Sequence, residues 1–340
     1  MKFSESWLRS FVDPACAGHE FSHLLTMAGL EVEEEETVAP LFDQVVVGHL
    51  LAVDKHPDAD RLNVCRVDVG TGELLQIVCG APNAAAGIKV PCALPGAELP
   101  GGFAIKVAKV RGIESSGMLC SARELGISED ASGLLVLGDD APIGEDIRRH
   151  LDLDDRLLTL KLTPNRADCL SLEGIAREVA ALTGMPARFI EVTAVDATIA
   201  STRALVLDAP DACPRYCGRV IAGVDARAAT PAWMRRRLER SGIRPISALV
   251  DITNYVMLEV GQPLHAFDNT RLSGTIHARM ARPAETILLL NEQILQMQAD
   301  VVLIADDQRP LAMGGIMGGE ESGITLATTE VFLEAAFFAP

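Results

Sequence analysis

The spacing of apolar and polar residues divides the chain into stretches of different predicted structure. In residues 1–38 apolar side chains recur every three or four positions, which predicts short helices. Ser4 is placed to cap the first of these helices, and Gly29 is placed to end the second. The acidic run over residues 33–36 predicts a solvated linker.

The hydrophobic period changes to two from about residue 40. Cys65, Val67 and Val69 alternate with polar neighbours, and glycine or proline separates runs of this kind. Many short strands with hardly any helix between them predict a small β-barrel over residues 40–151.

Helical spacing returns in residues 152–190 and ends at Gly184. From about residue 200 strand-like runs mix with one clear helix, which Thr230 is predicted to cap and Gly242 to follow. In this helix the apolar side chains are expected to face inward and the arginines outward. The first set is Trp233, Met234 and Leu238, and the second is Arg235, Arg236, Arg237 and Arg240.

Composition narrows the class of protein. With 340 residues and 49% hydrophobic residues, the chain is expected to be globular and to hold two or three domains. No apolar run reaches membrane-spanning length, and the eight cysteines contain no CxxC pair, so reduced thiols are expected. A net charge of -17 argues against a protein that coats nucleic acid indiscriminately, but leaves room for a local basic face.

Residues 19–23 read HEFSH and fit the HExxH pattern of zinc peptidases. The alternative is that His19 and His23 are polar residues on the outer face of an ordinary helix. Gly18 places His19 in the opening turn, and no third ligand follows in a recognisable pattern, although a catalytic zinc takes three protein ligands. We therefore expect no metal site in this chain.

Two segments in the last third of the chain concentrate polar groups and glycines. Residues 251–268 read DITNYVMLEVGQPLHAFD, with a Thr-Asn pair and His265. Residues 312–319 read AMGGIMGG, where the glycines allow a ligand to approach the backbone closely. Together with Glu334, these segments predict a lined pocket with a few polar groups.

These two segments resemble the editing (B3/B4) domain of bacterial phenylalanyl-tRNA synthetase beta subunits. Further segments resemble the same family in the same order: HPDADRL (56–62), VCGAPN (78–83), KVRGIESSGMLCS (109–121) and TPNRADCLS (163–171). The resemblance covers essentially the whole chain and implies a multidomain α+β protein. An OB-fold tRNA-binding (B2) barrel over 40–151 is inserted in a small helical α+β (B1) domain made of 1–39 and 152–195. An α+β editing domain, truncated at its C-terminus, follows over 200–340.

The resemblance also implies the activity, the partners and the cofactors. The family attaches phenylalanine to tRNA(Phe) with ATP, and the alpha subunit carries the ATP and phenylalanine site of the (αβ)2 heterotetramer. ATP and Mg²⁺ therefore belong to the holoenzyme, and no cofactor is expected in this portion. The chain is expected to be the N-terminal portion of a longer cytoplasmic subunit that binds tRNA(Phe) and the alpha subunit, with no membrane and no DNA partner.

An apolar pocket that accepts phenylalanine cannot strongly reject tyrosine, so a second site that hydrolyses the tyrosyl ester is a physically sensible correction. Glu334 is predicted to accept a hydrogen bond from the tyrosine hydroxyl, because a carboxylate is a strong acceptor. Thr253 and Asn254 are predicted to orient the substrate or the water. Gly318 is predicted to shape the pocket, and backbone N–H groups of the glycine run, including Gly315, are predicted to bind the oxyanion.

His265 leaves three interpretations open. It is a general-base candidate, and by family resemblance it instead holds the terminal adenosine of the tRNA. A lone histidine in a mostly apolar segment is also compatible with a satisfied core residue. We favour positioning over proton transfer.

Basic side chains suggest where an RNA backbone could lie. The arginine-rich helix and the residue after it form the most concentrated basic patch, and the barrel offers a second set. For both sets the alternative is an ordinary solvated face. The candidates are Arg235, Arg236 and Arg244, the last for the tRNA 3′ end, and Lys106, Lys109 and Arg111 in the barrel.

The rival function is a non-catalytic tRNA-binding accessory protein built on the OB-fold. It accounts for residues 40–151 but leaves the pocket segments without a purpose.

Overall fold

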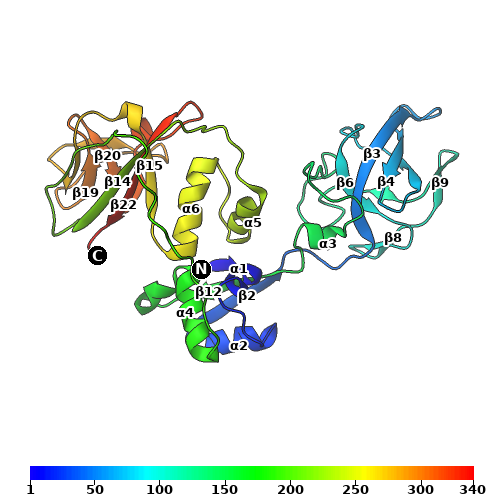
Figure 1. Ribbon diagram of the computed structural model, residues 1–340, viewed down its shortest axis with the longest axis horizontal. Coiled ribbons are helices and arrows are strands. Elements are labelled where there is room, and N and C mark those ends of the chain that lie inside the picture. The colour runs from blue at the N-terminus through cyan, green and yellow to red at the C-terminus, as the bar shows by residue number, and fades with distance from the viewer. The chain divides into compact units, whose positions relative to one another are not determined.

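The computed structural model describes residues 1–340, which divide into two compact units. One unit, here called the outer unit, contains residues 1–34 and 158–340, and the barrel unit contains residues 35–157 (Figure 1). The division of the outer unit into separate B1 and editing domains stays a prediction.

The barrel unit is built on a five-stranded antiparallel sheet with the order β11-β6-β3-β4-β5. The Ser116 N–H donates to the Gln76 carbonyl of β5 at 2.8 Å, so the two ends of the sheet meet and the barrel is nearly closed. The expected alternation is confirmed, since Cys65 and Val67 are fully buried. The elements are β3 (Val45–Lys55), β4 (Asn63–Asp68), β5 (Leu74–Cys79), β6 (Lys89–Ala93), β7 (Glu98–Leu99), β8 (Phe103–Ala104), β9 (Ala108–Val110), β10 (Ile113–Ser115), β11 (Met118–Leu119) and α3 (Ile147–His150).

The first part of the outer unit packs helices on a three-stranded sheet with the order β1-β12-β2. The Ser4 hydroxyl accepts from the Trp7 N–H at 3.1 Å, which confirms the predicted cap, and Gly184 ends α4 with a left-handed φ of 70°. The elements are β1 (Lys2–Ser4), α1 (Glu5–Arg9), α2 (His19–Met27), β2 (Glu31–Thr37), β12 (Arg156–Lys161), the 3₁₀ turn η1 (Pro164–Cys169) and α4 (Leu172–Thr183).

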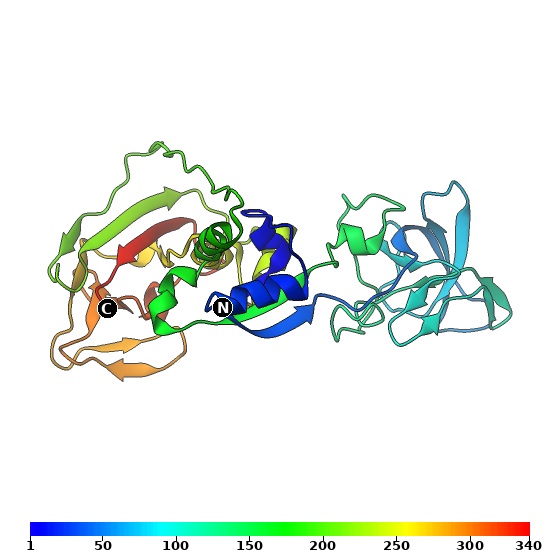
Figure 2. The ribbon, with the colours of Figure 1, turned by 90° about the horizontal axis from the view of Figure 1, so that it is seen from below.

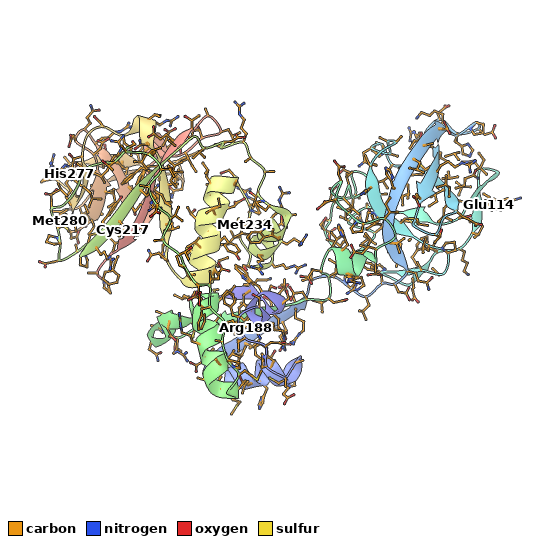
Figure 3. The ribbon with its side chains drawn as sticks, in the orientation of Figure 1. Glu114, Arg188, Cys217, Met234, His277 and Met280 are labelled. Carbon is orange, nitrogen blue, oxygen red and sulfur yellow. The ribbon has the colours of Figure 1, made fainter.

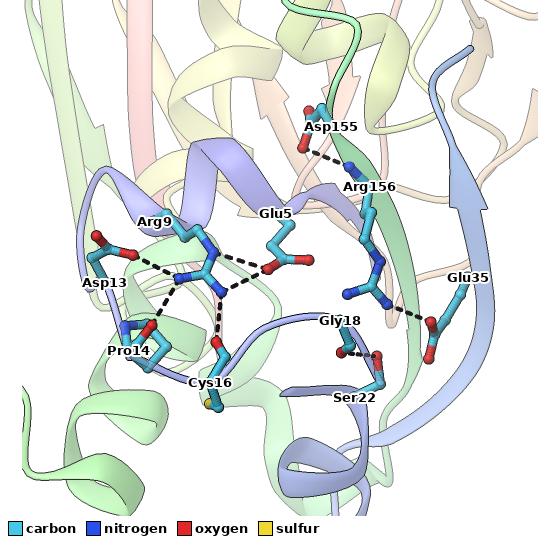
Figure 4. Close-up of polar contacts among 10 residues, drawn as sticks. All are labelled: Glu5, Arg9, Asp13, Pro14, Cys16, Gly18, Ser22, Glu35, Asp155 and Arg156. Atoms are coloured by element: carbon cyan, nitrogen blue, oxygen red, sulfur yellow. Dashed lines mark hydrogen bonds and ion pairs between the residues drawn. The ribbon is translucent and has the colours of Figure 1, made fainter. Parts of the chain in front are cut away.

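Two predictions for this region are wrong. Residues 33–36 are not a linker, because they lie in β2, and residues 156–161 form the strand β12 inside a stretch predicted to be helical. The strand β2 lies at the edge of its sheet, where exposed acidic side chains are compatible with backbone pairing on one side. Arg156 forms an ion pair with Glu35 (Figure 4).

Arg9 fastens the end of α1 to the loop that follows it (Figure 4). Its guanidinium donates to Glu5 at 2.8 Å and to Asp13 at 2.6 Å, and also to the carbonyls of Pro14 and Cys16. The planar five-donor group suits this many acceptors. The loop before α2 is thereby held by one side chain.

The second part of the outer unit pairs two sheets. A five-stranded sheet has the order β13-β16-β19-β20-β21, and a three-stranded antiparallel sheet has the order β14-β22-β15. Figures 1 and 2 show these strands with α6 beside β15. The elements are β13 (Leu205–Leu207), β14 (Arg215–Ala222), α5 (Ala232–Arg240), α6 (Ala248–Val260), β15 (Leu264–Asp268), η2 (Asn269–Arg271), β16 (Ile276–Met280), β17 (Thr286–Leu288), β18 (Ile294–Gln296), β19 (Val302–Ala305), β20 (Pro310–Met313), β21 (Met317–Gly318), η3 (Glu320–Ser322) and β22 (Glu330–Phe337).

A buried apolar cluster joins the two sheets. Phe332 of β22 and Phe267 of β15 pack against Ile304 of β19 and Leu311 of β20. Side chains on this face of the three-stranded sheet therefore point between the sheets, where water is largely excluded. Any polar group on the same face is placed in a low-dielectric setting.

The helix α5 differs from prediction in which side chains it buries. Met234 and Leu238 face inward as expected (Met234 is labelled in Figure 3), but Trp233 is 47% exposed and Arg240 is buried. Arg237 is also drawn inward: its guanidinium carbon lies 5.0 Å from the ring centre of Trp7, and it donates to the Tyr255 hydroxyl at 2.6 Å. A weakly hydrated guanidinium is well suited to such an aromatic setting.

Thr230 does not cap α5. Its hydroxyl instead bonds the carboxylate of Asp251, which is fully buried on α6 and also accepts from the Ile246 N–H at 2.9 Å. The cap position is taken by Pro231, with no side-chain hydrogen bond, and Gly242 follows the helix as predicted. A buried carboxylate needs its donors more than a helix end needs a cap, because unpaired charge is costly to bury.

All eight cysteines are free thiols, and only Cys217 is exposed (Cys217 is labelled in Figure 3). No helix in the structure has both the length and the apolar character needed to cross a bilayer.

Candidate functional site

Glu334 lies on β22, the middle strand of the three-stranded sheet. It pairs with Gly218 of β14 on one side and with His265 of β15 on the other. Directly opposed residues of neighbouring strands share a face, so the carboxylate and the imidazole point to the same side of the sheet. Glu334 is 7% exposed and lies on the middle strand, so it is not a solvent-facing glutamate at a sheet edge.

Tyr216 of β14 supplies the hydrogen bond to this buried carboxylate. Its hydroxyl donates to Oε2 of Glu334 at 2.6 Å, and both residues are buried. Burial raises the pKa of the Glu334 carboxyl to about 7, and donation from Tyr216 opposes that rise. Burial also raises the pKa of the Tyr216 phenol, and the neighbouring carboxylate adds to the effect, so the phenol remains the donor.

His265 presents an unpartnered ring nitrogen in the same place. Its Nε2 is buried and has no hydrogen-bond partner, and its ring packs edge-on against Phe267 with centroids 4.4 Å apart. Burial lowers the pKa of His265 to about 4, so the imidazole is neutral at pH 7. A base this weak is a poor proton acceptor at neutral pH, whereas a buried unpaired nitrogen is suited to bind a ligand group.

Gly318 completes the group, which we call the Glu334 cluster: Tyr216, His265, Gly318 and Glu334. A Cβ atom at Gly318 would lie 2.7 Å from Nε2 of His265, and closer still to its Cε1. The same Cβ would lie 3.0 Å from Cδ1 of Leu290, whose N–H bonds the Gly318 carbonyl. Only glycine leaves the imidazole in its observed place.

The rest of the glycine run differs from the predicted oxyanion site. The N–H groups of Gly314, Ile316 and Gly319 already donate to backbone carbonyls, so these three are not available for an oxyanion. Gly315 lies against Phe338, since a Cβ there would be 2.9 Å from Cδ2 of that ring. Most of the run therefore serves a tight hairpin turn and close packing.

Thr253 and Asn254 lie on α6. The Thr253 hydroxyl donates to the Val250 carbonyl of its own helix at 2.7 Å, and no hydrogen bond links either residue to the Glu334 cluster. Their role in orienting a substrate or water stays a prediction.

The arginine candidates separate into exposed and packed side chains. Arg235 and Arg244 are exposed and line a hollow of about 420 Å³ together with Arg227, while Arg236 is half-buried. Of the four arginines predicted to face outward from α5, Arg240 is buried and Arg237 is half-buried against Trp7 and Tyr255. The basic surface is smaller than predicted, and Arg227 joins it.

The basic candidates of the barrel are all exposed. Lys109 stands opposite Glu114 on the β9–β10 hairpin, and Arg111 occupies its turn with a φ of 51° (Glu114 is labelled in Figure 3). Lys106 lies before β9. Their binding to an RNA backbone stays a prediction.

His19 and His23 are exposed on α2, with ring centroids 6.4 Å apart. The structure contains no group of three or more His, Cys, Asp and Glu side chains arranged to hold a metal ion.

Sequence reasoning missed Tyr216. The chain has two tyrosines, and each donates to a buried glutamate: Tyr255 donates to Glu259 at 2.8 Å. The available signal was a phenol in a strand-like run, which needs a partner when buried. The partner lies more than a hundred positions away, so spacing could not reveal it.

The raised pKa of Glu334 gives a prediction for stability. Because the folded state binds this proton more tightly than the unfolded state, its stabilising effect is complete below pH 4.5 and is lost as pH rises to about 7. Glu334→Gln is expected to be more stable than the wild type by about 3 kcal/mol above pH 7, with the difference vanishing towards pH 4.5. Thermal denaturation at pH 5, 7 and 8.5 tests this, with Glu320→Gln at an exposed position as control. An equal stability difference at all three pH values would contradict it.

Comparison with known proteins identifies the family. Residues 45–146 match the "Putative tRNA binding domain" profile, and residues 212–340 match the "B3/4 domain" profile. The phenylalanine–tRNA ligase beta subunit of Dechloromonas aromatica is 72% identical over all 340 residues, and that of Aromatoleum aromaticum is 64% identical over the same length. The chain belongs to the family of phenylalanine–tRNA ligase beta subunits. It spans 43% of the length of each of these two relatives.

Solved structures add only a distant likeness. An N-terminal fragment of the phenylalanyl-tRNA synthetase beta subunit from Pyrococcus horikoshii aligns with a TM-score of 0.33 at 16% identity, over 55% of this chain and 57% of that one. The family membership rests on the bacterial beta subunits.

Proposed function

We propose that the outer unit hydrolyses tyrosine wrongly attached to tRNA(Phe), as the editing part of a phenylalanine–tRNA ligase beta subunit. The observation that carries the proposal is the buried carboxylate of Glu334 beside an unpartnered imidazole nitrogen and a glycine that must stay glycine. Family membership supplies the substrate class. The non-catalytic accessory protein built on the OB-fold leaves this cluster unexplained.

The cluster suits discrimination by a hydroxyl. Oε2 of Glu334 accepts a hydrogen bond from Tyr216. Oε1 has no hydrogen-bond partner within the protein and is not completely buried. The hydroxyl of a tyrosyl ester can donate a hydrogen bond to Oε1. A phenylalanyl ester has no hydroxyl, so its ring would remove water from Oε1 without replacing the hydrogen bond. Sites that hydrogen-bond a hydroxyl reject the analogue without it far more strongly than apolar pockets reject an added one.

In the reaction a water molecule adds to the ester carbonyl and the bond to the ribose oxygen breaks. The products are free tyrosine and tRNA with its terminal hydroxyl restored. Neutral His265 is suited to hold a hydroxyl or adenosine group through Nε2 rather than to remove the proton from water. Gly318 leaves room for the imidazole itself, because a Cβ there would collide with the ring.

The remaining functions also follow from the family. We propose that the barrel unit is an inserted OB-fold that binds tRNA(Phe), with Lys106, Lys109 and Arg111 near its backbone, and that Arg227, Arg235 and Arg244 steer the 3′ end. We further propose a cytoplasmic (αβ)2 holoenzyme, to which this chain contributes the editing domain. We propose that ATP and Mg²⁺ belong to the full holoenzyme, with the ATP and phenylalanine site on the alpha subunit.

The test is deacylation of purified Tyr-tRNA(Phe) and Phe-tRNA(Phe) by the full-length beta subunit with its alpha partner. We expect kcat/KM for the tyrosyl ester to exceed that for the phenylalanyl ester by about 100-fold or more, because one charged hydrogen bond separates them. Equal rates, or no hydrolysis of either ester above the spontaneous rate, would refute the editing function.

A further inference from the structure

The surroundings of Glu334 do not by themselves fix the orientation or the protonation state of its carboxyl group. Glu334 is only 7% exposed, and its one hydrogen-bond donor within the protein is the Tyr216 phenol rather than a cationic side chain. The other titratable groups around it are Tyr216 of β14, Cys213 just before that strand, and the neutral His265 of β15. The strands β20 and β21 carry no titratable side chains. A buried carboxyl with two equivalent oxygens and no cation can rotate, or take up a proton and become a donor.

Tyr216 opposes both changes, rotation and protonation, from its place on the sheet. It pairs with Ala336 in the β14–β22 ladder, so it lies diagonally across from Glu334 on the same face. From there its hydroxyl reaches Oε2 at 2.6 Å. Gly218, directly opposite Glu334, has no side chain, and a Cβ there would collide with Phe332.

We propose that Tyr216 is a positioning residue for discrimination: its hydroxyl holds Oε2 of Glu334, which leaves Oε1 as the acceptor for the phenol of the ligand. Tyr216 is itself a phenol bound to this carboxylate. The hydrogen bond between Tyr216 and Glu334 is therefore of the same kind, phenol to carboxylate, as the one proposed for a tyrosyl ester. The inference rests on the proposed editing function and adds a residue that acts through Glu334 without contacting the scissile bond.

Two consequences follow from the geometry. Without the Tyr216 donor, the carboxyl holds its proton to higher pH, because hydrogen bonding to the charged form is lost. A protonated Glu334 no longer presents a charged acceptor, so the preference for the tyrosyl ester weakens. Both changes act on discrimination and on its pH dependence rather than on the fold.

Tyr216→Phe in the full-length holoenzyme tests the proposal. We expect the ratio of kcat/KM for Tyr-tRNA(Phe) to that for Phe-tRNA(Phe) to fall about 10-fold at pH 7, and the pH midpoint of tyrosyl deacylation to rise by about one unit. Tyr255→Phe is the matched control, since it deletes the other hydroxyl that donates to a buried glutamate, away from the cluster. It is expected to leave both quantities unchanged.

Replacing Tyr216 site-specifically with a difluorotyrosine provides a second variant that keeps the ring and strengthens the donor. The pH midpoint should then move below that of the wild type. If Tyr216→Phe lowers the hydrolysis rates of both esters equally and does not shift the pH midpoint, Tyr216 has only a packing role. That result overturns the proposal. An unchanged ratio and midpoint overturns it too.

A third variant separates this proposal from the proposed function. If Glu334→Gln removes tyrosyl selectivity while Tyr216→Phe behaves as wild type, Tyr216 has no positioning role and editing by this cluster stands. If Glu334→Gln retains full selectivity, the editing role of the cluster falls, and the Tyr216 proposal falls with it.

Discussion

Gly318→Ala is expected to lower the rate of Tyr-tRNA(Phe) deacylation by about 100-fold, because an ångström-scale displacement of a positioning group is enough for such a loss. The added Cβ would lie 2.7 Å from Nε2 of His265 and 3.0 Å from Leu290, so the imidazole must leave its place. The measurement is single-turnover hydrolysis of the purified tyrosyl ester by the holoenzyme, alongside phenylalanine charging, which is expected to be unaffected.

Gly80→Ala is a suitable control for this substitution. Gly80 lies in the barrel unit, has no left-handed φ, and would bring its Cβ only to ordinary contact, 3.4 Å from Leu62. Deacylation by Gly318→Ala at the wild-type rate would show that His265 is not held in place for the reaction.

Glu334→Ala is expected to remove the preference for the tyrosyl ester, lowering the ratio of the two kcat/KM values by about 100-fold. The physical reason is that the variant has no carboxylate. The tyrosine hydroxyl loses its charged acceptor, and a phenylalanine ring no longer has to desolvate an unpaired acceptor. Competition between the two esters in one reaction measures the ratio directly and cancels errors in enzyme concentration.

Glu330→Ala serves as control, because Glu330 lies on the same strand but outside the cluster. If Glu334→Ala hydrolyses both esters with wild-type selectivity, the carboxylate does not read the hydroxyl. A loss of rate for both esters without loss of selectivity would also count against that role.

Local signals in the sequence predicted local structure well. Ser4 and Gly184 act where expected because a cap or a left-handed turn depends on a few adjacent backbone groups. The alternating apolar residues of the barrel were equally readable, since period two fixes which side chains face inward.

The predictions that failed are mostly those in which a side chain contacts a residue far away in the sequence. Thr230 bonds Asp251 rather than its own helix, and Arg237 turns inward because Trp7 and Tyr255 surround it. The acidic strand β2 looked like a linker because an edge strand can expose nearly all its side chains.

The candidate site shows the same division. His265, Gly318 and Glu334 were predicted to meet by resemblance to a family, and the register of β15 with β22 provides the physical reason for two of them. Gly318 joins them because β21 brings a residue without a side chain against the imidazole. Tyr216 escaped prediction since nothing local marks a phenol whose partner lies on another strand.

Arg237 lies within 6 Å of the ring centres of both tryptophans in the chain, Trp7 from α1 and Trp233 from α5. Intrinsic tryptophan fluorescence from this polypeptide therefore originates entirely where α1, α5 and α6 pack together, a contact region that we call the seam. A spectral change on heating reports the opening of that seam, while the barrel unit, which has no tryptophan, is optically silent at these wavelengths. One fluorophore introduced into the barrel would let the two units be followed separately in a single sample.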